Sequence, residues 1–300
     1  MAESTTRAAL ECSLDRIIDR FSGRIGFYAR NLTTGEEIAR DADTPYPTAS
    51  VIKLAVLAEI LRLSAAHELA LDRRILMTAE DIVAGSGVLK EMMPGLEPTV
   101  RDLASLMIVV SDNTATNMLI DLAGGVDAVN HLTRDVLGLA GVTLYNRIDF
   151  DRIEGEARKL AEGTPRDLAG LVAALVDPAT FGAEAADEAV RILRRQQFLD
   201  QVPRYLEVTS YSKELGLDES LWVASKTGFM PGTWVDAGMI RLPDDQRIVY
   251  CAATNGSTDE SMSSEAEGAV ANGLLGRLLV EYWWSSNTGV PPLRGSAYLV

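Results

Sequence analysis

The sequence predicts an α/β (α+β) fold in two lobes, with an antiparallel sheet lobe formed by both ends of the chain and a helical lobe between them. Two observations predict this arrangement. Strand-like patterns occur before residue 45 and again after residue 220, whereas the patterns in between are mostly helical. Each end of the chain also supplies a helix. We therefore expect one domain over residues 1–300, with residues 1–45 and 198–300 in the sheet lobe and residues 46–197 in the helical lobe.

The N-terminal part is expected to form a helix followed by a hairpin. Residues 5–21 have the apolar spacing of a helix, and residues 24–32 and 37–42 have strand character. The turn between the two strands is predicted at residues 33–35, where Gly35 favours a tight turn.

The middle part of the chain is predicted to be helical, and the C-terminal part to contain strands and a final helix. Glycine and proline residues separate the helical patterns of residues 47–197 at 85–87, 94–95, 124–125 and 163–165. Further strands are predicted at 221–225, 235–242 and 247–253, followed by a final helix at about 265–282.

Composition excludes several classes of partner. The net charge is −15, so most of the surface would repel a phosphate backbone or an anionic lipid. We expect a soluble protein without nucleic-acid partners or membrane insertion, and we favour a monomer. The N-terminus lacks a basic segment followed by an apolar one, which predicts a cytoplasmic protein as written, or a periplasmic or secreted one if a signal peptide preceded it.

Metal and histidine chemistry are not expected either. His67 and His131 are the only histidines, and neither lies near clustered cysteines or in the sequence context of a nucleophile elbow. We predict no metal and no cofactor. Cys12 and Cys251 lie far apart and are expected to be two buried free thiols.

Lysine is rare in this chain, and two of its five lysines follow a serine by three residues. Ser50-Val-Ile-Lys53 follows two prolines and begins an apolar helical run, so Lys53 would stand one turn beyond the Ser50 hydroxyl. Burial would lower the pKa of Lys53 and make it a base. Ser210 and Lys213 lie in a polar stretch, where an exposed ammonium keeps its proton. We predict Ser50 as the nucleophile and Ser210 as a chance match.

Two further motifs raise the specificity of this pattern. Ser111-Asp112-Asn113 lies between two helical patterns, and Lys226-Thr227-Gly228 lies at the end of a strand. Each alone is explained by a helix cap or a turn glycine. The three motifs together, in this order, are a much stronger signal.

In these motifs the sequence resembles class A β-lactamases and penicillin-binding proteins, which share Ser-x-x-Lys, Ser-Asp-Asn and Lys-Thr-Gly. The stretches "SDNTATNMLIDLAGG" and "GTPRDLAGLV" extend the resemblance, which covers nearly the whole chain. It implies a β-lactamase/transpeptidase-like fold and a serine hydrolase that forms a covalent acyl-enzyme.

The resemblance also implies roles for individual residues. Ser50 would attack an acyl carbonyl, with Lys53 as the base or part of the proton relay. The backbone N–H groups of Ser50 and Phe229 would form the oxyanion hole, and Ser111 would pass a proton to the leaving nitrogen. Substrate-binding roles fall to Asn113 for a side-chain amide and to Lys226, Thr227 and Gly228 for the carboxylate region.

The Ω loop departs from the family pattern. Class A enzymes place a water-activating glutamate there, and by position we assign this role to Asp149, with Glu154 and Glu156 as alternatives. The asparagine expected four residues later is replaced by Ile153, and we expect Arg147 to pair with Glu162.

A second departure follows Lys-Thr-Gly, where many class A enzymes carry an arginine and this chain has Thr233-Trp234. We therefore expect a serine β-lactamase that hydrolyses β-lactam amides, acting on a small β-lactam or acyl-peptide-like substrate. The alternatives are a penicillin-binding DD-carboxypeptidase or esterase of the same fold, and a non-catalytic sensor that stays acylated.

Overall fold

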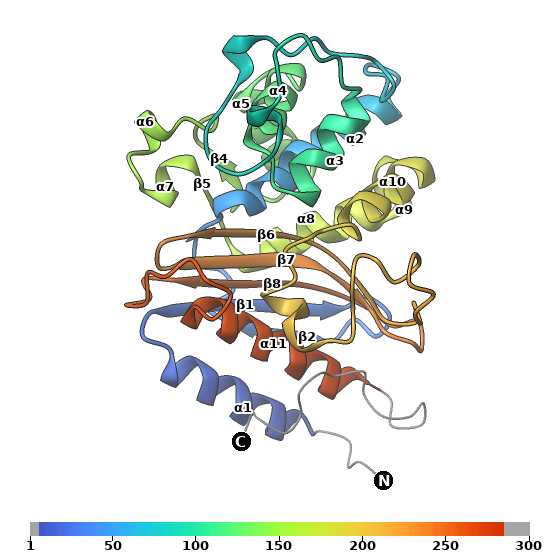
Figure 1. Cartoon of the computed structure of the whole chain (residues 1–300). Helices are drawn as coiled ribbons and strands as arrows, with labels where there is room; N and C mark the ends of the chain where they lie inside the picture. The colour runs from blue at the N-terminus through green and yellow to red at the C-terminus, as the bar shows by residue number, and fades with distance from the viewer. Residues whose placement is uncertain (1–5, 285–300) are drawn as a thin grey trace.

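A computed structural model describes residues 6–284 of the chain. Its centre is a five-stranded antiparallel sheet with strand order β2-β1-β8-β7-β6 (Figure 1). The strands are β1 (Arg24–Asn31), β2 (Glu37–Arg40), β6 (Trp222–Met230), β7 (Thr233–Arg241) and β8 (Arg247–Asn255). Strands from both ends of the chain therefore pair side by side, as the sequence predicts.

Helices cover both faces of this sheet. The terminal helices α1 (Arg7–Arg20) and α11 (Glu267–Trp283) pack on one face, and α8 (Pro165–Val176) packs on the other, beneath the helical region (Figure 1). Strand β8 explains how one sheet has two apolar faces: Val249 and Cys251 join the core on the helical side, while Ile248 and Tyr250 join the core around α1 and α11. Alternate side chains of a strand point to opposite faces.

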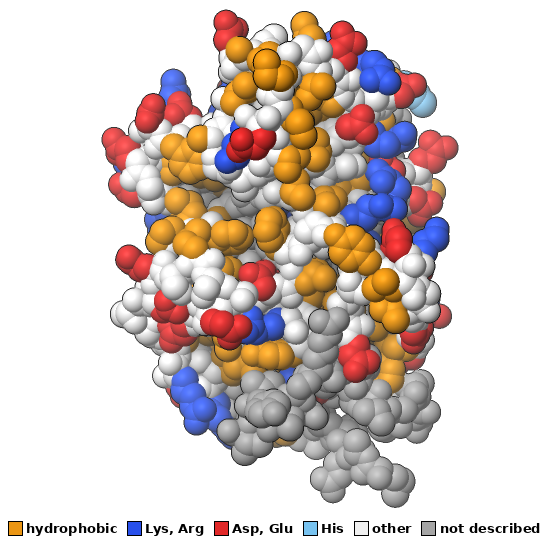
Figure 2. Space-filling model, viewed as in Figure 1, with side chains coloured by type: hydrophobic (Ala, Val, Ile, Leu, Met, Phe, Trp, Pro, Cys, Tyr) orange, Lys and Arg blue, Asp and Glu red, His pale blue; other side chains and the backbone are white. Residues whose placement is uncertain are grey.

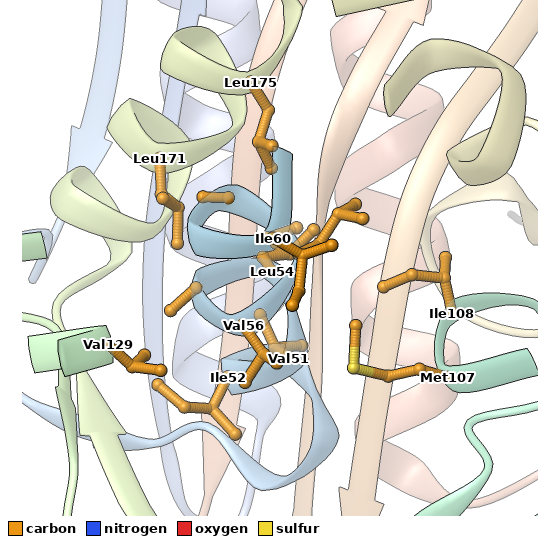
Figure 3. Close-up of a cluster of buried hydrophobic side chains, with 14 of the residues drawn as sticks. Val51, Ile52, Leu54, Val56, Ile60, Met107, Ile108, Val129, Leu171 and Leu175 are labelled. Atoms are coloured by element: carbon orange, nitrogen blue, oxygen red, sulfur yellow. The ribbon is translucent and has the colours of Figure 1, made fainter. Parts of the chain in front are cut away.

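The helical region is built around α2 (Lys53–Ala65). Its residues from Lys53 to Leu61 are all buried, as expected for a helix that is apolar all round. Leu54, Val56 and Ile60 belong to the same cluster of buried side chains as Met107 and Ile108 of α3 (Val100–Val109) (Figure 3). The other helical elements are η1 (Ala49–Ile52), η2 (Ala79–Asp81), η3 (Leu89–Glu91), α3 (Val100–Val109), α4 (Asn113–Leu122), α5 (Val126–His131), η4 (Leu132–Val136), α6 (Phe150–Ile153), α7 (Ala157–Leu160), α9 (Pro178–Phe181), α10 (Ala183–Leu193) and η5 (Val202–Tyr205).

A second, smaller sheet was not expected from the sequence. It has the order β3-β5-β4, from β3 (Tyr46–Pro47), β4 (Thr143–Leu144) and β5 (Ala161–Gly163). Strands of two or three residues are too short to produce a readable alternation. In this sheet β5 pairs with both β3 and β4. The segment just before Ser50 therefore lies beside the strands at the two ends of the loop that contains α6 and α7.

Three details differ from expectation or extend it. Strand β6 continues through Lys226-Thr227-Gly228 to Met230 rather than ending at residue 225. Both cysteines are free, but Cys12 is exposed and only Cys251 is buried, because Cys12 lies on the outer side of α1. None of the helices within residues 6–284 combines the length and apolar character needed to cross a bilayer.

Candidate active site

Ser50 lies in the short helix η1, one turn before α2, as the sequence predicts. Ala49 precedes it with φ of 44°, a left-handed conformation that costs energy for a residue with a side chain. The turn packs directly on strand β6. A β-carbon at Gly228 would lie 2.6 Å from the backbone nitrogen of Ser50 and 2.7 Å from the carbonyl oxygen of Thr48. Only glycine permits this close approach of the two backbones.

Lys53 is fully buried beside the Ser111 turn. Its Nζ donates to the Ser111 carbonyl oxygen at 2.7 Å, to Ser111 Oγ at 3.0 Å and to Asn113 Oδ1 at 2.9 Å. Burial lowers the pKa of Lys53 well below its ordinary value, the nearby Lys226 lowers it further, and Asp112 opposes the shift. A lowered pKa favours the neutral amine, which is the form of Lys53 that can accept a proton.

The Ser111-Asp112-Asn113 turn is held in place by Asp112. Its Oδ1 caps α4 by accepting from Ala115 N at 2.9 Å, and its Oδ2 accepts from the backbone N–H groups of Val88 and Leu89 at 2.6 and 2.8 Å. Ser111 has φ of 56°, a second strained residue beside the site. Asp112 thus joins α4 to the loop 84–88 and fixes Ser111 against Lys53.

The loop 84–88 supplies a residue that sequence reasoning missed. Ser86 Oγ donates to the Ser111 carbonyl at 2.7 Å and to Asn113 Oδ1 at 3.2 Å. Gly85 and Gly87 flank it with positive φ, so the Gly-Ser-Gly sequence was a usable signal. Asn113 Nδ2 donates to the Ala84 carbonyl at 2.9 Å. In this arrangement, the amide group expected to bind substrate is held by the loop.

The Lys-Thr-Gly residues form the edge of the sheet beside Ser50. Lys226 is fully buried and its Nζ donates to the Thr227 carbonyl at 2.5 Å. Thr227 Oγ1 is buried and has no hydrogen-bond partner within residues 6–284. Phe229 pairs with Trp234 in the β6–β7 ladder, and their rings stack with centroids 4.9 Å apart. Trp234, one of the two residues that stand where many class A enzymes carry an arginine, is thus buried against Phe229.

Asp236 on the neighbouring strand β7 is a buried ionisable residue that sequence analysis did not identify. It is fully buried, accepts from Val202 N at 3.1 Å and contacts the Tyr250 hydroxyl at 3.2 Å. Burial raises the pKa of Asp236 to about 7 and lowers the pKa of Lys226 to about 7, and the Asp236 charge opposes the shift of Lys226. The two groups therefore change charge in the same pH range.

These elements enclose a cavity of about 280 Å³. Ser50, Ser111, Asn113, Thr227, Gly228 and Phe229 line it. The structure thus brings six of the nine predicted site residues to one cavity. Lys53 and Lys226 lie buried behind it, with Lys53 bonded to Ser111 and Asn113.

Asp149, the ninth residue, does not line this cavity. It is the N-cap of α6, where its Oδ1 accepts from the backbone N–H groups of Asp151 and Arg152. It lines a second hollow, which shares Ile148 and Phe150 with the Ser50 cavity. The alternatives Glu154 and Glu156 are exposed and pair with Lys159. A role for any of these carboxylates in activating water stays a prediction.

Ile148, not Asp149, is the loop residue held against the site. The buried side chain of Asn117 donates to the Ile148 carbonyl at 2.9 Å and accepts from Ile148 N at 2.9 Å. The Ile148 side chain lines the Ser50 cavity, as does Ile153. Asp149 is the next residue of an extended segment, so its side chain lies on the opposite side of the backbone.

Two other sequence expectations concern charged residues outside the cavity. Arg147 pairs with Asp121 at 3.0 Å rather than with Glu162, which pairs with Arg158 one helical turn away. The pairing prediction was wrong because Arg147 lies next to α4. The chance match is placed as expected: Ser210 Oγ accepts from Gln197 at 3.2 Å and lies outside the Ser50 cavity.

Comparison with known proteins agrees with this geometry. The model of the β-lactamase enzyme family matches residues 9–283. β-Lactamase L2 of Stenotrophomonas maltophilia is 29% identical over 201 residues, which cover 66% of this chain and 63% of that protein. The chain spans less than two thirds of the length of the first curated relatives that it matches.

Two solved structures have the same fold over nearly their whole length. The β-lactamase of Sphaerobacter thermophilus has a TM-score of 0.79 and 29% identity, with 92% of this chain and 97% of that chain covered. A variant of PBP-A, determined as an acyl-enzyme complex with penicillin G, has a TM-score of 0.77 and 25% identity, with 92% and 96% covered. The match over residues 9–283 shows that this chain belongs to the β-lactamase enzyme family.

Proposed function

We propose that this protein is a serine hydrolase that opens β-lactam amides through an ester on Ser50. The observation that carries the proposal is the contact of Lys53 with Ser111 and Asn113 beside the Ser50 turn, in a cavity that strand β6 closes. The solved PBP-A variant, an acyl-enzyme with penicillin G, supports acylation on this fold.

In acylation, Ser50 Oγ attacks the carbonyl carbon, a carbon–oxygen bond forms, and the amide carbon–nitrogen bond breaks. The proton of the hydroxyl passes to neutral Lys53. Ser111, which contacts Lys53 Nζ at 3.0 Å, gives its own proton to the leaving nitrogen and takes one from Lys53 in return. The backbone N–H groups of Ser50 and Phe229 stabilise the oxyanion.

The carboxylate of a β-lactam is assigned to the region of Lys226 and Thr227. The buried hydroxyl of Thr227 lacks a partner within the described residues, and a buried hydroxyl without a partner is costly unless a ligand supplies one. Lys226 carries a positive charge below its pKa, and the charge of Asp236 raises that pKa.

Hydrolysis of the ester on Ser50 needs a base that activates water. The residues that line the cavity point to a second candidate function. Among the described residues that line the Ser50 cavity there is no aspartate or glutamate. This observation favours a protein that acylates rapidly and releases the product slowly, as a sensor or a DD-carboxypeptidase inhibited by β-lactams would. Lys53, or Asp149 after a movement of the loop, would have to activate water for fast turnover.

One experiment separates the candidates. The protein is mixed with a chromogenic cephalosporin, and intact mass is followed together with absorbance. A β-lactamase gives many turnovers per molecule, whereas a sensor gives one equivalent of colour and a lasting mass increase on Ser50. Neither colour nor adduct would refute the proposed function, and an esterase assay on an acyl ester would then test the remaining alternative.

A further inference from the structure

Two amide side chains, Gln201 and Asn272, are buried between α11 and the hairpin formed by β6 and β7. Both residues are 0% exposed, and neither lines the Ser50 cavity. Removing an amide from water is costly unless hydrogen bonds replace those that it made to water. The partners of these two side chains therefore show what the pair does in the core.

The pair forms hydrogen bonds to both strands of the hairpin. Asn272 Nδ2 donates to the Trp234 carbonyl of β7 at 3.2 Å and to Gln201 Oε1 at 2.8 Å. Gln201 Nε2 in turn donates to the Gly228 carbonyl of β6 at 3.4 Å. Because Asn272 occupies the amide oxygen of Gln201, the NH₂ group of Gln201 is the part that faces β6.

The Gly228 carbonyl belongs to the same peptide group as the Phe229 N–H, the proposed oxyanion donor. No peptide bond within residues 6–284 is cis, so the C=O and N–H of this planar group point in opposite directions. The peptide also lies against the nucleophile turn, since a β-carbon at Gly228 would lie 2.6 Å from Ser50 N. Gln201 therefore holds one end of a dipole whose other end is the Phe229 N–H.

A hydrogen bond to the carbonyl affects the N–H in two ways. It draws electron density from the amide nitrogen, which makes the N–H a stronger donor, and it limits rotation of the peptide plane. A donor that already points at the developing oxyanion stabilises the transition state without reorganisation. The length of 3.4 Å describes the unliganded protein, and hydrogen bonds of active sites often shorten as the transition state forms.

The cavity side of this peptide is apolar. The Phe229 ring contacts the rings of Trp234 and Phe198, with centroid distances of 4.9 and 6.1 Å. Hydrophobic side chains also gather along the junction between the helical region and the sheet (Figure 2). Apolar side chains cannot donate to the Gly228 carbonyl, so its side-chain donor comes from the core.

We propose that Gln201 is a positioning residue of the oxyanion hole: held by Asn272, it orients and polarises the peptide whose Phe229 N–H stabilises the oxyanion. The inference rests on the proposed function and extends its machinery to two residues that no substrate touches.

The first test needs no substrate. Gln201→Met keeps the length of the side chain but has no N–H to donate. In the unliganded protein, the nitrogen resonance of the Phe229 amide should move upfield in this variant, because the carbonyl of the same peptide loses a donor. An unchanged resonance in a folded variant would overturn the inference. Asn272→Leu, which releases Gln201 but keeps its N–H, should move the resonance in the same direction by less.

The chain contains a matched control at the other end of the sheet. Asn31 Nδ2 donates to Gln246 Oε1 at 2.7 Å, and Gln246 Nε2 donates to the Trp283 carbonyl at 3.1 Å. This pair repeats the arrangement of Asn272 and Gln201, and neither of its members lines the Ser50 cavity. Gln246→Met should therefore leave the Phe229 resonance at its wild-type position. Urea unfolding checks that each variant is folded.

The second test measures the chemistry at Ser50. The protein is acylated with penicillin G, and the stretching frequency of the ester carbonyl is read from an infrared difference spectrum. Weaker hydrogen bonding from Phe229 N–H should raise this frequency in Gln201→Met. Acylation should slow by about three- to thirtyfold, less than the roughly hundred- to thousandfold expected when an oxyanion donor is lost outright.

Gln246→Met should keep both the carbonyl frequency and the acylation rate of the wild type. Equal changes in the two variants, or a slower Gln201→Met reaction with an unchanged carbonyl frequency, would argue that Gln201 only stabilises the fold. No adduct with the wild-type protein would refute the proposed function, and the Phe229 resonance would still decide whether Gln201 acts on this peptide.

Discussion

Replacing Asn117 by alanine tests whether α4 holds the loop that contains α6 and α7 against the Ser50 cavity. The side chain makes two hydrogen bonds of 2.9 Å to the backbone of Ile148, and Asn117 is 3% exposed. Two neutral hydrogen bonds contribute about 1–3 kcal/mol, and the buried N–H and C=O of Ile148 add a penalty if they stay without partners. We expect Asn117→Ala to lower the free energy of unfolding by about 2–4 kcal/mol.

The same change should alter the chemistry at Ser50. Once released, Ile148 no longer lines the Ser50 cavity in a fixed position, so the rate at which a β-lactam acylates Ser50 should fall. Hydrogen exchange at the Ile148 amide should become faster. Urea unfolding measures the stability, and intact mass at timed intervals after mixing with penicillin G measures the rate of acylation.

The chain contains a matched control for this variant. Asn130 makes the same two bonds to Leu144, from Nδ2 to the carbonyl and from the backbone N–H to Oδ1, both at 2.8 Å. Leu144 does not line the Ser50 cavity. Asn130→Ala should therefore cost about 1–3 kcal/mol of stability and leave the rate of acylation near the wild-type value. If both variants slowed acylation equally, the hydrogen bonds from Asn117 to Ile148 would have no specific role in the site.

Three further predictions concern the reacting groups. Ser50→Ala should abolish both turnover and the mass adduct, while Ser210→Ala leaves both near wild type; residual adduct in Ser50→Ala would refute the nucleophile. Acylation by a substrate with a carboxylate should decline as pH rises through about 7, because Lys226, whose pKa burial lowers to about 7, loses its proton. A neutral ester should lack this decline. Asp236→Asn should move it to lower pH, since the Asp236 charge raises the pKa of Lys226; an upward shift would contradict this coupling. Asp149→Asn should leave the lifetime of the acyl-enzyme near wild type, because asparagine also caps helices and the carboxylate lies outside the cavity. A longer lifetime, measured by intact mass after a short incubation, would restore Asp149 as the base.

Much of the site could be predicted because its parts depend on local sequence. Ser50 and Lys53 are separated by three residues at a helix start, so their relation follows from helical geometry. The Asp112 cap and the Lys226 strand are also local features. The strands of the central sheet were predictable from alternation, and their common sheet from their position at both ends of the chain.

The loop residues could not be placed in the same way. Asp149 and Ile148 are neighbours, and nothing in their order says which faces Ser50. The answer depends on the two bonds from Asn117, a residue 31 positions earlier. The apolar character of the cavity likewise comes from segments distant in sequence, such as Phe150, Phe229 and Met262.

By itself, then, the sequence determined the two-lobed fold, the family and the motif residues around Ser50, because periodicity, helix starts and short motifs act over a few residues. The tertiary structure decided which loop side chain enters the cavity, that Lys226 and Asp236 share a buried environment, and that no described cavity residue is charged. These properties depend on burial and on contacts between distant segments, which are set only when the sheet and the helices pack together.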